Sequence, residues 1–266
     1  MMRKNGSVKG GQRRQWLPGG KEQTARGAWI RKHLKSRPIG VNLNSCLMNS
    51  LFHDRRDAGK RLAAKLTQYA SQPDVIVLGL PRGGVPVAYE VAVGLGVPLD
   101  LFVVRKLGVP GQEELAMGAI ASGGIRVLNS GVIAAMHISA DVIDQVAALE
   151  LSELERREQA YRGGHPAPEV FGRTVILVDD GLATGATLRA ACAALRRMEV
   201  RSIVAAVPVA ASATVRAMRA EVDELVVVLT PDRFLSVGQW YSDFSQTTGA
   251  EVGELLRQAN ERWKQS

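Results

Sequence analysis

The chain has 266 residues, of which 46% are hydrophobic and 5% aromatic, and it carries a formal net charge of +8. This length can hold one large α/β domain or two small ones, and the composition is ordinary for a soluble globular protein. No apolar run reaches the roughly 18 residues that a membrane-spanning helix needs, and no N-terminal stretch has the character of a signal peptide, so we expect no membrane association.

The positive charge is concentrated in the N-terminal segment. Residues 1–46 contain eleven Lys or Arg and a single acid, a net charge of +10, so residues 47–266 have a net charge of −2. Because the segment is rich in glycine and shows no sustained hydrophobic period, we predict that residues 1–47 are a disordered extension before a domain at residues 48–266. Two interpretations stay open: an arm that binds nucleic acid through counterion release, or an extension preceding a true start at Met48.

The first βα unit carries a pair of glycines. Asp54 is suited to cap a helix, and residues 74–79 predict a buried strand that leads to Arg82, Gly83 and Gly84. Two glycines after a strand allow a positive φ or a strained peptide that presents N–H groups to an anion, and Arg82 can add a charge-assisted contact. A plain strand-to-helix connection is the alternative interpretation.

The next unit brings positive charge to the same edge of the predicted sheet. A strand over residues 99–104 leads into Arg105 and Lys106, which leave its carboxyl end and could neutralise an anion there. Glycines and a proline at residues 108–111 make the segment 105–114 a candidate for a mobile lid. A solvated hairpin is the alternative.

The pattern changes between residues 116 and 162. Two short strands, 116–121 and 125–128, predict an antiparallel hairpin. Ser139 is suited to cap a long helix that ends near Arg162. The apolar residues assigned to the inner side of this helix are Val142, Val146, Leu149 and Leu154. The charged run over residues 150–158 predicts a solvent-facing outer side.

The remaining core elements alternate between strand and helix. Strands are predicted at residues 175–178, 203–209 and 224–229, with helices at 188–198 and after a cap at Ser212. This alternation predicts an α/β fold with a doubly wound, mainly parallel sheet and right-handed crossovers. Ligands bind such sheets outside the carboxyl ends of the strands.

A polar turn follows the strand at residues 175–178. The four apolar residues fit a strand covered on both faces, and Asp179 and Asp180 come directly after it. Residues 184–187, Thr-Gly-Ala-Thr, stand where the next helix begins, and unpaired N–H groups and the helix dipole favour a phosphate at such a place. An ordinary turn with two solvated acids and a Thr cap is the alternative.

The run from Val178 to Thr187 resembles the phosphoribosyl pyrophosphate (PRPP) loop of the type I phosphoribosyltransferases. The resemblance implies that Asp179 and Asp180 bind the ribose hydroxyls and that the turn holds the 5-phosphate. The residues implied for this turn are Ala183, Thr184, Gly185, Ala186 and Thr187. From Met48 onward the chain also resembles a group of bacterial phosphoribosyltransferase-like proteins of unassigned substrate.

The other two loops fit the same resemblance. It implies that the loop with Arg82, Gly83 and Gly84 binds pyrophosphate. It also implies that the segment 105–114 closes over PRPP.

The C-terminal segment departs from the β-α alternation. Residues 234–244 contain four aromatics, and a helix is predicted from about 250 to 264. In type I phosphoribosyltransferases a small hood outside the core sheet covers the second substrate, so the resemblance implies that Trp240 or Tyr241 stacks on a base there. Packing of this segment on the first helix is the alternative.

The resemblance implies a transferase that displaces pyrophosphate from C1 of PRPP through an oxocarbenium-like transition state. Asp179 and Asp180 would stabilise charge on the ribose, and Arg82, Arg105 and Lys106 would stabilise the leaving group. Mg2+ would be carried mainly by the oxygens of PRPP, since the sequence offers no dedicated metal site. The acceptor would be a nucleobase-like small molecule that these residues do not identify.

We further expect a homo-oligomer that takes part in nucleotide metabolism in the cytoplasm. Cys46 and Cys192 form neither a disulfide framework nor a metal-ligand set, which favours a reducing compartment. The alternative of a different class is a regulatory protein that binds PRPP or a nucleotide, has lost transfer, and contacts RNA through residues 1–46.

Overall fold

The structure is a computed structural model that describes residues 51–265. The predictions for residues 1–47, including the extension and its binding of nucleic acid, and the prediction for Met48 lie outside the described residues.

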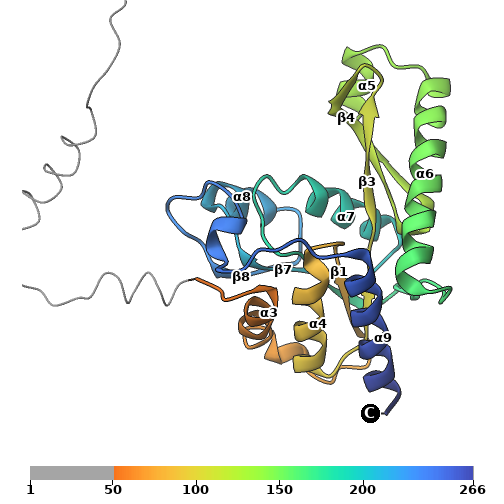
Figure 1. The fold of residues 1–266 in the computed structure, drawn as a ribbon. Helices are drawn as coiled ribbons and strands as arrows, with labels where there is room; N and C mark the ends of the chain where they lie inside the picture. The colour runs from red at the N-terminus through yellow and green to blue at the C-terminus, as the bar shows by residue number, and fades with distance from the viewer. Residues whose placement is uncertain (1–50, 266) are drawn as a thin grey trace, which may run out of the picture. The chain divides into compact units, whose positions relative to one another are not determined.

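A five-stranded parallel sheet forms the centre of the described region (Figure 1). Its strands, in spatial order, are β2 (Leu99–Leu101), β1 (Val75–Gly79), β6 (Thr174–Val178), β7 (Ser202–Val209) and β8 (Glu224–Leu229). Each neighbouring pair is parallel. Every residue of β1 and β6 is buried, as expected for apolar, β-branched strands in a sheet covered on both faces. The predicted α/β fold with a doubly wound, mainly parallel sheet is confirmed.

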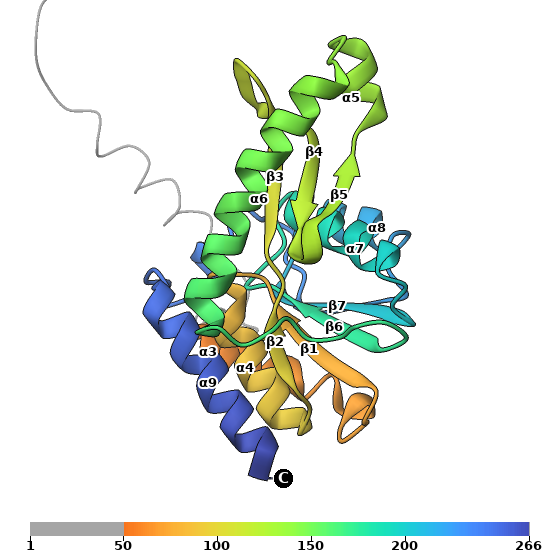
Figure 2. The ribbon, with the colours of Figure 1, turned by 90° about the vertical axis from the view of Figure 1, so that its right-hand side faces the viewer.

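Helices cover both faces of this sheet (Figures 1 and 2). Because side chains alternate along a strand, Val75 and Val77 of β1 join one core cluster and Ile76 and Leu78 join the other. The first cluster contains residues of α3 (Arg55–Ala63), α4 (Gly84–Leu95) and α9 (Gly249–Gln265). The second contains residues of α7 (Ala186–Arg197) and α8 (Ser212–Met218).

A second, antiparallel sheet packs between α7 and the long helix α6 (Ala140–Arg162), as Figure 2 shows. Its strands are β3 (Val104–Val109), β4 (Gln112–Ala121) and β5 (Ile125–Leu128), and the short helix α5 (Ser130–Ala135) follows. The predicted hairpin at residues 116–121 and 125–128 is confirmed. We call β3 to β5, α5 and α6 the arm.

The predicted single strand over residues 99–104 is wrong. β2 ends at Leu101, and the chain crosses into the arm before β3 begins at Val104. At the crossing the Ser122 Oγ accepts a hydrogen bond from the Val103 N–H at 2.8 Å, and the Ser122 N–H donates to the Val103 carbonyl at 2.9 Å. Phe102 and Val103 are buried nonetheless, so the apolar run continues without a break through the crossing.

The predicted long helix is confirmed, but its buried side differs from the prediction. Ser139 caps α6, and its Oγ accepts from the Val142 N–H at 3.4 Å. Ile143, Ala147 and Leu154 are buried, whereas Leu149 is 74% exposed. The buried three lie four and seven residues apart, the spacing of one helix face, and Leu149 falls outside that face.

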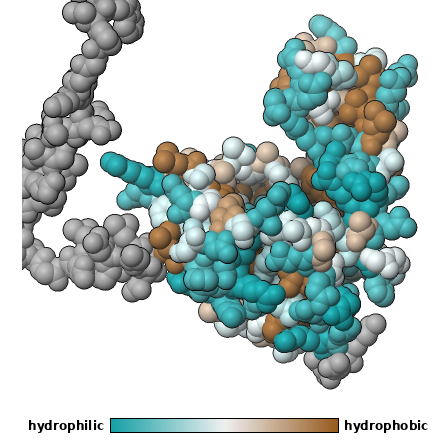
Figure 3. All heavy atoms as spheres, in the orientation of Figure 1, coloured by the Kyte–Doolittle hydropathy of each residue, from teal (hydrophilic) through white to brown (hydrophobic). Residues whose placement is uncertain are grey.

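Smaller features complete the described region. Short 3-10 turns occur at Thr67–Tyr69, Ser122–Gly124 and Gly238–Trp240. The predicted cap at Ser212 is wrong, because its hydroxyl donates to the Pro231 carbonyl and does not accept a hydrogen bond from a backbone N–H at the start of α8. In the view of Figure 3 most of the surface is hydrophilic, and apolar patches gather near α5, a part of the arm where Leu128 and Met136 are exposed.

None of the helices within residues 51–265 combines the length and apolar character needed to cross a bilayer.

Candidate functional site

Two loops meet where the order of strands in the parallel sheet reverses. From β1 the chain passes to β2 on one side, and β6, β7 and β8 continue on the other side. Such a switch point leaves a crevice at the carboxyl ends of the two strands, here β1 and β6. The loop with Arg82 and Gly83 follows β1, and Asp179 and Asp180 follow β6, so the structure brings these predicted residues to one place.

The two glycines are required because the loops approach closely. A Cβ at Gly84 would lie 2.7 Å from the Val178 carbonyl oxygen and 2.9 Å from Asp179 Cα, and a Cβ at Gly83 would overlap the Asp180 carboxylate. Of the two expected features, the positive φ is absent, since Gly83 has a φ of −63°, whereas the peptide bond between Pro81 and Arg82 in this loop is cis. The two glycines themselves are needed because neither position has room for a side chain.

Asp180 has a partner that the sequence did not reveal. The Arg55 Nε donates to Asp180 Oδ2 at 2.9 Å, and the two side chains are only 12% and 16% exposed. Arg55 also donates through Nη1 to the Ser245 carbonyl at 2.7 Å and lies 3.9 Å from the centroid of the Phe244 ring. The pair joins residues 125 positions apart, so no local spacing could have indicated it.

The two neighbouring acids therefore have different surroundings. Burial raises the pKa of Asp179 well above its ordinary value, and the charge of Asp180 raises it further. Burial also raises the pKa of Asp180, but the Arg55 guanidinium opposes that increase. Asp179 Oδ1 accepts from the Asp180 N–H at 2.9 Å. Asp180 is thus engaged by a cation, while Asp179 is the more strongly perturbed acid at the crevice.

The predicted phosphate turn precedes α7. Gly185 has a φ of +78°, and α7 begins at Ala186 without a side-chain cap. Ala183, Thr184, Ala186 and Thr187 are exposed, so their backbone and hydroxyl groups are open to a ligand. A Cβ at Gly185 would lie 3.1 Å from the methyl group of Thr214 on α8. A side chain at position 185 would therefore point toward α8. The positive φ of Gly185 is the reason that glycine is needed there.

Arg82 stands beside a small cavity. Its side chain is exposed, and within residues 51–265 it forms no ion pair. The adjoining cavity, of about 100 Å3, is also lined by Thr187 and by Arg157 and Tyr161 of α6. Arg157 and Tyr161 are site candidates that we missed, because they belong to or follow the charged run that we assigned to solvent.

Arg105 and Lys106 are not on a loop, which corrects the prediction of a lid at residues 105–114. Both lie within β3, which pairs with β4 as an antiparallel hairpin. An Arg105 terminal nitrogen is 2.5 Å from Glu150 on α6, and Lys106 Nζ is 3.2 Å from Glu114. The hairpin alternative describes this segment, and Glu150 already neutralises the charge of Arg105. Lys106 lines a groove of about 420 Å3 between the arm and α7.

The aromatic segment packs on the start of α3, as the alternative interpretation held. The Phe52 N–H donates to the Trp240 carbonyl at 2.8 Å, and the Tyr241 ring lies 5.3 Å from that of Phe52 and 5.0 Å from that of Phe244. Tyr241 is 6% exposed and its hydroxyl donates to the Asp180 carbonyl at 2.5 Å. Burial raises the pKa of this hydroxyl, which keeps its proton. Stacking of Tyr241 on a base is therefore wrong; Trp240 is half-buried, and its role stays a prediction.

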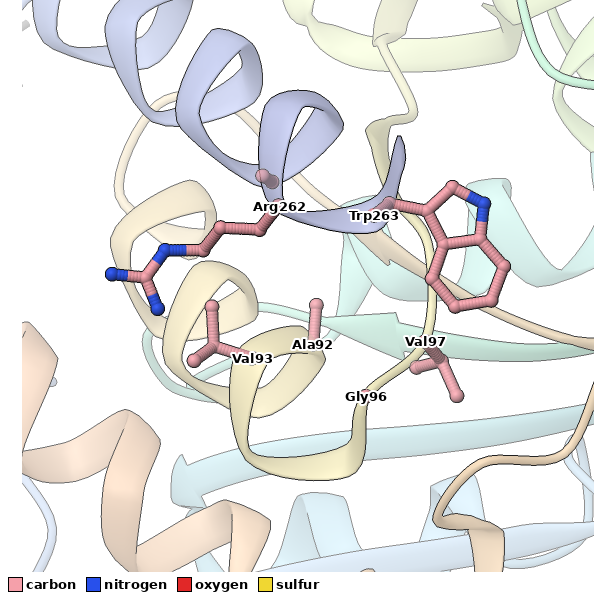
Figure 4. A pocket seen from close by; sticks show the side chains of 7 residues that line it. Ala92, Val93, Gly96, Val97, Arg262 and Trp263 are labelled. Carbon is pink, nitrogen blue, oxygen red and sulfur yellow. The ribbon is translucent and has the colours of Figure 1, made fainter. Parts of the chain in front are cut away.

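A separate pocket of about 300 Å3 lies at the opposite end of α4 from Gly84 (Figure 4). Val93 and Val97 belong to its apolar part, and Arg262 and Trp263 of α9 border it. Across residues 51–265, no three His, Cys, Asp or Glu side chains form a cluster that could hold a metal ion. Among the predicted binding residues, those of the loops after β1 and β6 lie together at the switch point.

Comparisons with known proteins concern most of this region. A family model described as the phosphoribosyl transferase domain matches residues 50–237, which include all the candidate residues except Trp240 and Tyr241. A Mycobacterium tuberculosis protein named "Putative phosphoribosyl transferase" is 48% identical over 210 residues in each of two strains, covering 79% of this chain and 47% of the relative. The chain thus spans about half the length of the curated relatives it matches.

One solved structure matches this chain over nearly the whole length of the solved protein. The crystal structure of a Thermus thermophilus protein has 40% sequence identity and a TM-score of 0.70, and the match covers 78% of this chain and 98% of that one.

Proposed function

The chain belongs to the phosphoribosyl transferase domain family, and from this premise we propose that it binds Mg-PRPP and transfers the phosphoribosyl group to a nucleobase-like acceptor with release of pyrophosphate. The observation that carries the proposal is the meeting of the two loops at the switch point. Gly83 and Gly84 lie against Asp179 and Asp180 so closely that neither glycine has room for a side chain. A sugar diphosphate needs such an arrangement, because its ribose and its pyrophosphate must be held side by side.

The 5-phosphate is assigned to the turn before α7. Ala183, Thr184, Gly185, Ala186 and Thr187 are the residues proposed to hold it. The uncapped first turn of α7 offers N–H donors, and the helix dipole adds a favourable field for an anion. The hydroxyls of Thr184 and Thr187 are exposed and can donate as well.

The ribose is assigned to the two acids, with unequal roles. Asp179 would stabilise the positive charge that grows on the ribose as its bond to pyrophosphate breaks. A cationic ring next to Asp179 would favour its ionised form and so reverse the effect of burial on its pKa. Asp180, already paired with Arg55, would accept from a ribose hydroxyl and fix the position of the loop.

The leaving pyrophosphate is assigned to the loop after β1. Arg82 has an exposed guanidinium and no ion pair within the described residues, so it can form a bidentate contact with phosphate oxygens. Lys106 lies in a groove that also contains Thr187, and it could approach the substrate from the arm. Arg105 contributes less than first predicted, because Glu150 already holds it.

Magnesium fits this donor set as a substrate-borne ion. Mg2+ prefers oxygen ligands and keeps several waters, and the Asp179 carboxylate together with the oxygens of PRPP would supply such ligands. Its chemistry there would be to neutralise charge on the pyrophosphate. The residues of this chain would position the substrate, exclude water and stabilise the ribose.

The proposal is tested by titrating the full chain with Mg-PRPP in a calorimeter and by assaying pyrophosphate release with a panel of nucleobases and related acceptors. We expect saturable binding and release that depends on one acceptor. Asp179→Asn should lower the rate of release on the order of a hundredfold, in the range found when a group that stabilises the transition state is removed. Asp141→Asn, an exposed acid at the start of α6, is the matched control.

Two outcomes would contradict the proposal. Absence of Mg-PRPP binding would exclude both transfer and regulation by this ligand. Tight binding without release for any acceptor would leave the non-catalytic alternative as the better account of the site.

A further inference from the structure

A cavity of about 100 Å3 lies between the loop after β1 and the long helix of the arm. Arg82 and Thr187 line it from the parallel sheet, and Arg157 and Tyr161 line it from α6. Water occupies roughly 30 Å3 per molecule in the liquid, so this space can hold several waters or a small polyatomic anion. The cavity touches both segments already assigned to PRPP, because Arg82 belongs to the loop after β1 and Thr187 belongs to the turn at the start of α7.

The charges around this cavity are of one sign. Two guanidinium groups line it, and no Asp or Glu is among its lining residues. Within residues 51–265, Arg82 has no ion pair, and Arg157 is bound by Glu153 only through Nε, at 2.7 Å. Both terminal nitrogens of Arg157 are therefore left with unused donors. Two cations that share a small cavity repel each other unless an anion lies between them.

We propose that Arg157 and Tyr161 of α6 bind the pyrophosphate group of PRPP together with Arg82. The inference rests on the proposed function and adds two binding residues to it. The terminal nitrogens of Arg157 and the Tyr161 hydroxyl would donate to phosphate oxygens. The leaving group is then held between the parallel sheet and the arm, and α6 takes the role that the sequence had suggested for Arg105.

The chain supplies a matched control in the residue next to Arg157. Glu153 binds both arginines: it accepts from Arg156 at 2.7 and 3.0 Å and from Arg157 at 2.7 Å. The side chains of Arg156 and Arg157 are 69% and 42% exposed, and only Arg157 lines the cavity. Replacing either arginine removes one positive charge and one of the two arginine partners of Glu153, so weaker binding in Arg157→Gln alone would come from the cavity.

The experiment uses the full chain and three probes: Mg-PRPP, Mg-pyrophosphate and ribose 5-phosphate. Calorimetric titrations would compare the wild type with Arg157→Gln, Tyr161→Phe and Arg156→Gln. We expect Arg157→Gln to weaken binding of the two pyrophosphate-containing probes at least tenfold, the size of one charge-assisted hydrogen bond. Tyr161→Phe should weaken them severalfold. Ribose 5-phosphate should bind all variants within twofold of the wild type, and Arg156→Gln should match the wild type with every probe.

The possible outcomes separate this inference from the proposed function. If PRPP binds and the two arginine variants behave alike, the inference is wrong while the proposed function stands. If PRPP does not bind but pyrophosphate does, and only Arg157→Gln weakens it, the proposed function is wrong and the cavity site stands. If neither probe binds the wild type, both are wrong.

Folding of each variant is checked by circular dichroism and thermal melting. Arg157→Lys provides a second measurement, because it keeps the charge but loses the planar pair of donors. We expect an intermediate loss of affinity for the pyrophosphate probes. Wild-type affinity in both Arg157→Lys and Arg157→Gln would overturn the inference.

Discussion

The parallel sheet and the arm differ in how their residues are buried. Every residue of β1 and β6 is buried, whereas β5 is half-buried or exposed throughout. The arm buries apolar side chains such as Leu107 and Met117, and ion pairs also link α6 to β3 and β5, through Arg105 and Glu150 and through Arg126 and Asp144, each at 2.5 Å. Apolar burial fixes the first region, and pairs of charged side chains contribute to the second.

The junction between the two regions gives the largest expected effect. Arg162, at the end of α6, donates to Asp100 of β2 at 2.9 Å and to the Leu101 carbonyl at 3.0 Å, and it lies 3.1 Å from Glu158. Burial raises the pKa of Asp100, and Arg162 opposes this. Arg162→Ala leaves buried acids without their cation, so we expect a loss of about 3 to 5 kcal/mol in the free energy of unfolding, measured with urea.

A double variant tests this explanation. Replacing the pair with apolar residues, as in Asp100→Leu with Arg162→Met, removes the unpaired charge of Asp100 and should recover part of the loss, while Glu158 keeps its hydrogen bond from the Ser122 hydroxyl. A cost below about 1 kcal/mol for Arg162→Ala would mean that the junction is not a buried charge network.

Two leucines test the comparison between the parallel sheet and the arm. The sequence pattern predicts that both of them are buried. Leu177 of β6 is fully buried, and Leu177→Ala should cost about 3 kcal/mol through lost contacts and a cavity. Leu149 of α6 is 74% exposed, so Leu149→Ala should change the stability by less than about 0.5 kcal/mol. Chemical denaturation of both variants checks this contrast. Equal costs would show that Leu149 is buried in solution.

The parallel sheet could be predicted because its sequence pattern and its burial agree. The apolar run at β6 is bounded by polar residues, and the structure has a strand there whose residues are all buried. The loops after β1 and β6 could be predicted to share an edge, because parallel strands end on the same side. The long helix α6 could also be predicted, since Ser139 is a typical N-cap residue at its start.

Contacts between distant residues could not be predicted from local patterns. The bond between Arg55 and Asp180 joins two elements that no spacing relates. The apolar run from Leu99 to Val104 stays buried while it changes sheets, so hydrophobicity gives no sign of the break. Arg157 lies in a run of charges that fits a solvated helix face equally well, and only the packing of α6 over the loop after β1 shows the cavity.

The smallest predicted effect is the pH dependence of the stability that two acids contribute, Asp179 after β6 and Glu153 in the arm. The two contributions should change with pH in opposite directions. Burial raises the pKa of Asp179 above its ordinary value, so the folded state holds the proton more tightly than the unfolded state. Its ionisation therefore lowers stability as the pH rises from about 4 through the folded pKa. In Asp179→Asn this penalty is absent. We expect the variant to unfold like the wild type near pH 4 and to be more stable than the wild type at pH 8, while the rate of pyrophosphate release falls on the order of a hundredfold.

Glu153 in the arm is the counterpart, because Arg156 and Arg157 lower its pKa to about 2. Its ionised form favours the folded state, so its contribution is present above the ordinary pKa of a glutamate and is lost as the pH falls toward 2. Glu153→Gln should therefore reduce the thermal stability slightly at pH 7 and not at all near pH 2. Thermal melting of both variants across pH 3 to 8 measures the two slopes. If the two contributions to the melting temperature changed with pH in the same direction, the pKa of Asp179 would not be raised in the folded protein. The crevice would then stabilise the ionised carboxylate before any substrate binds.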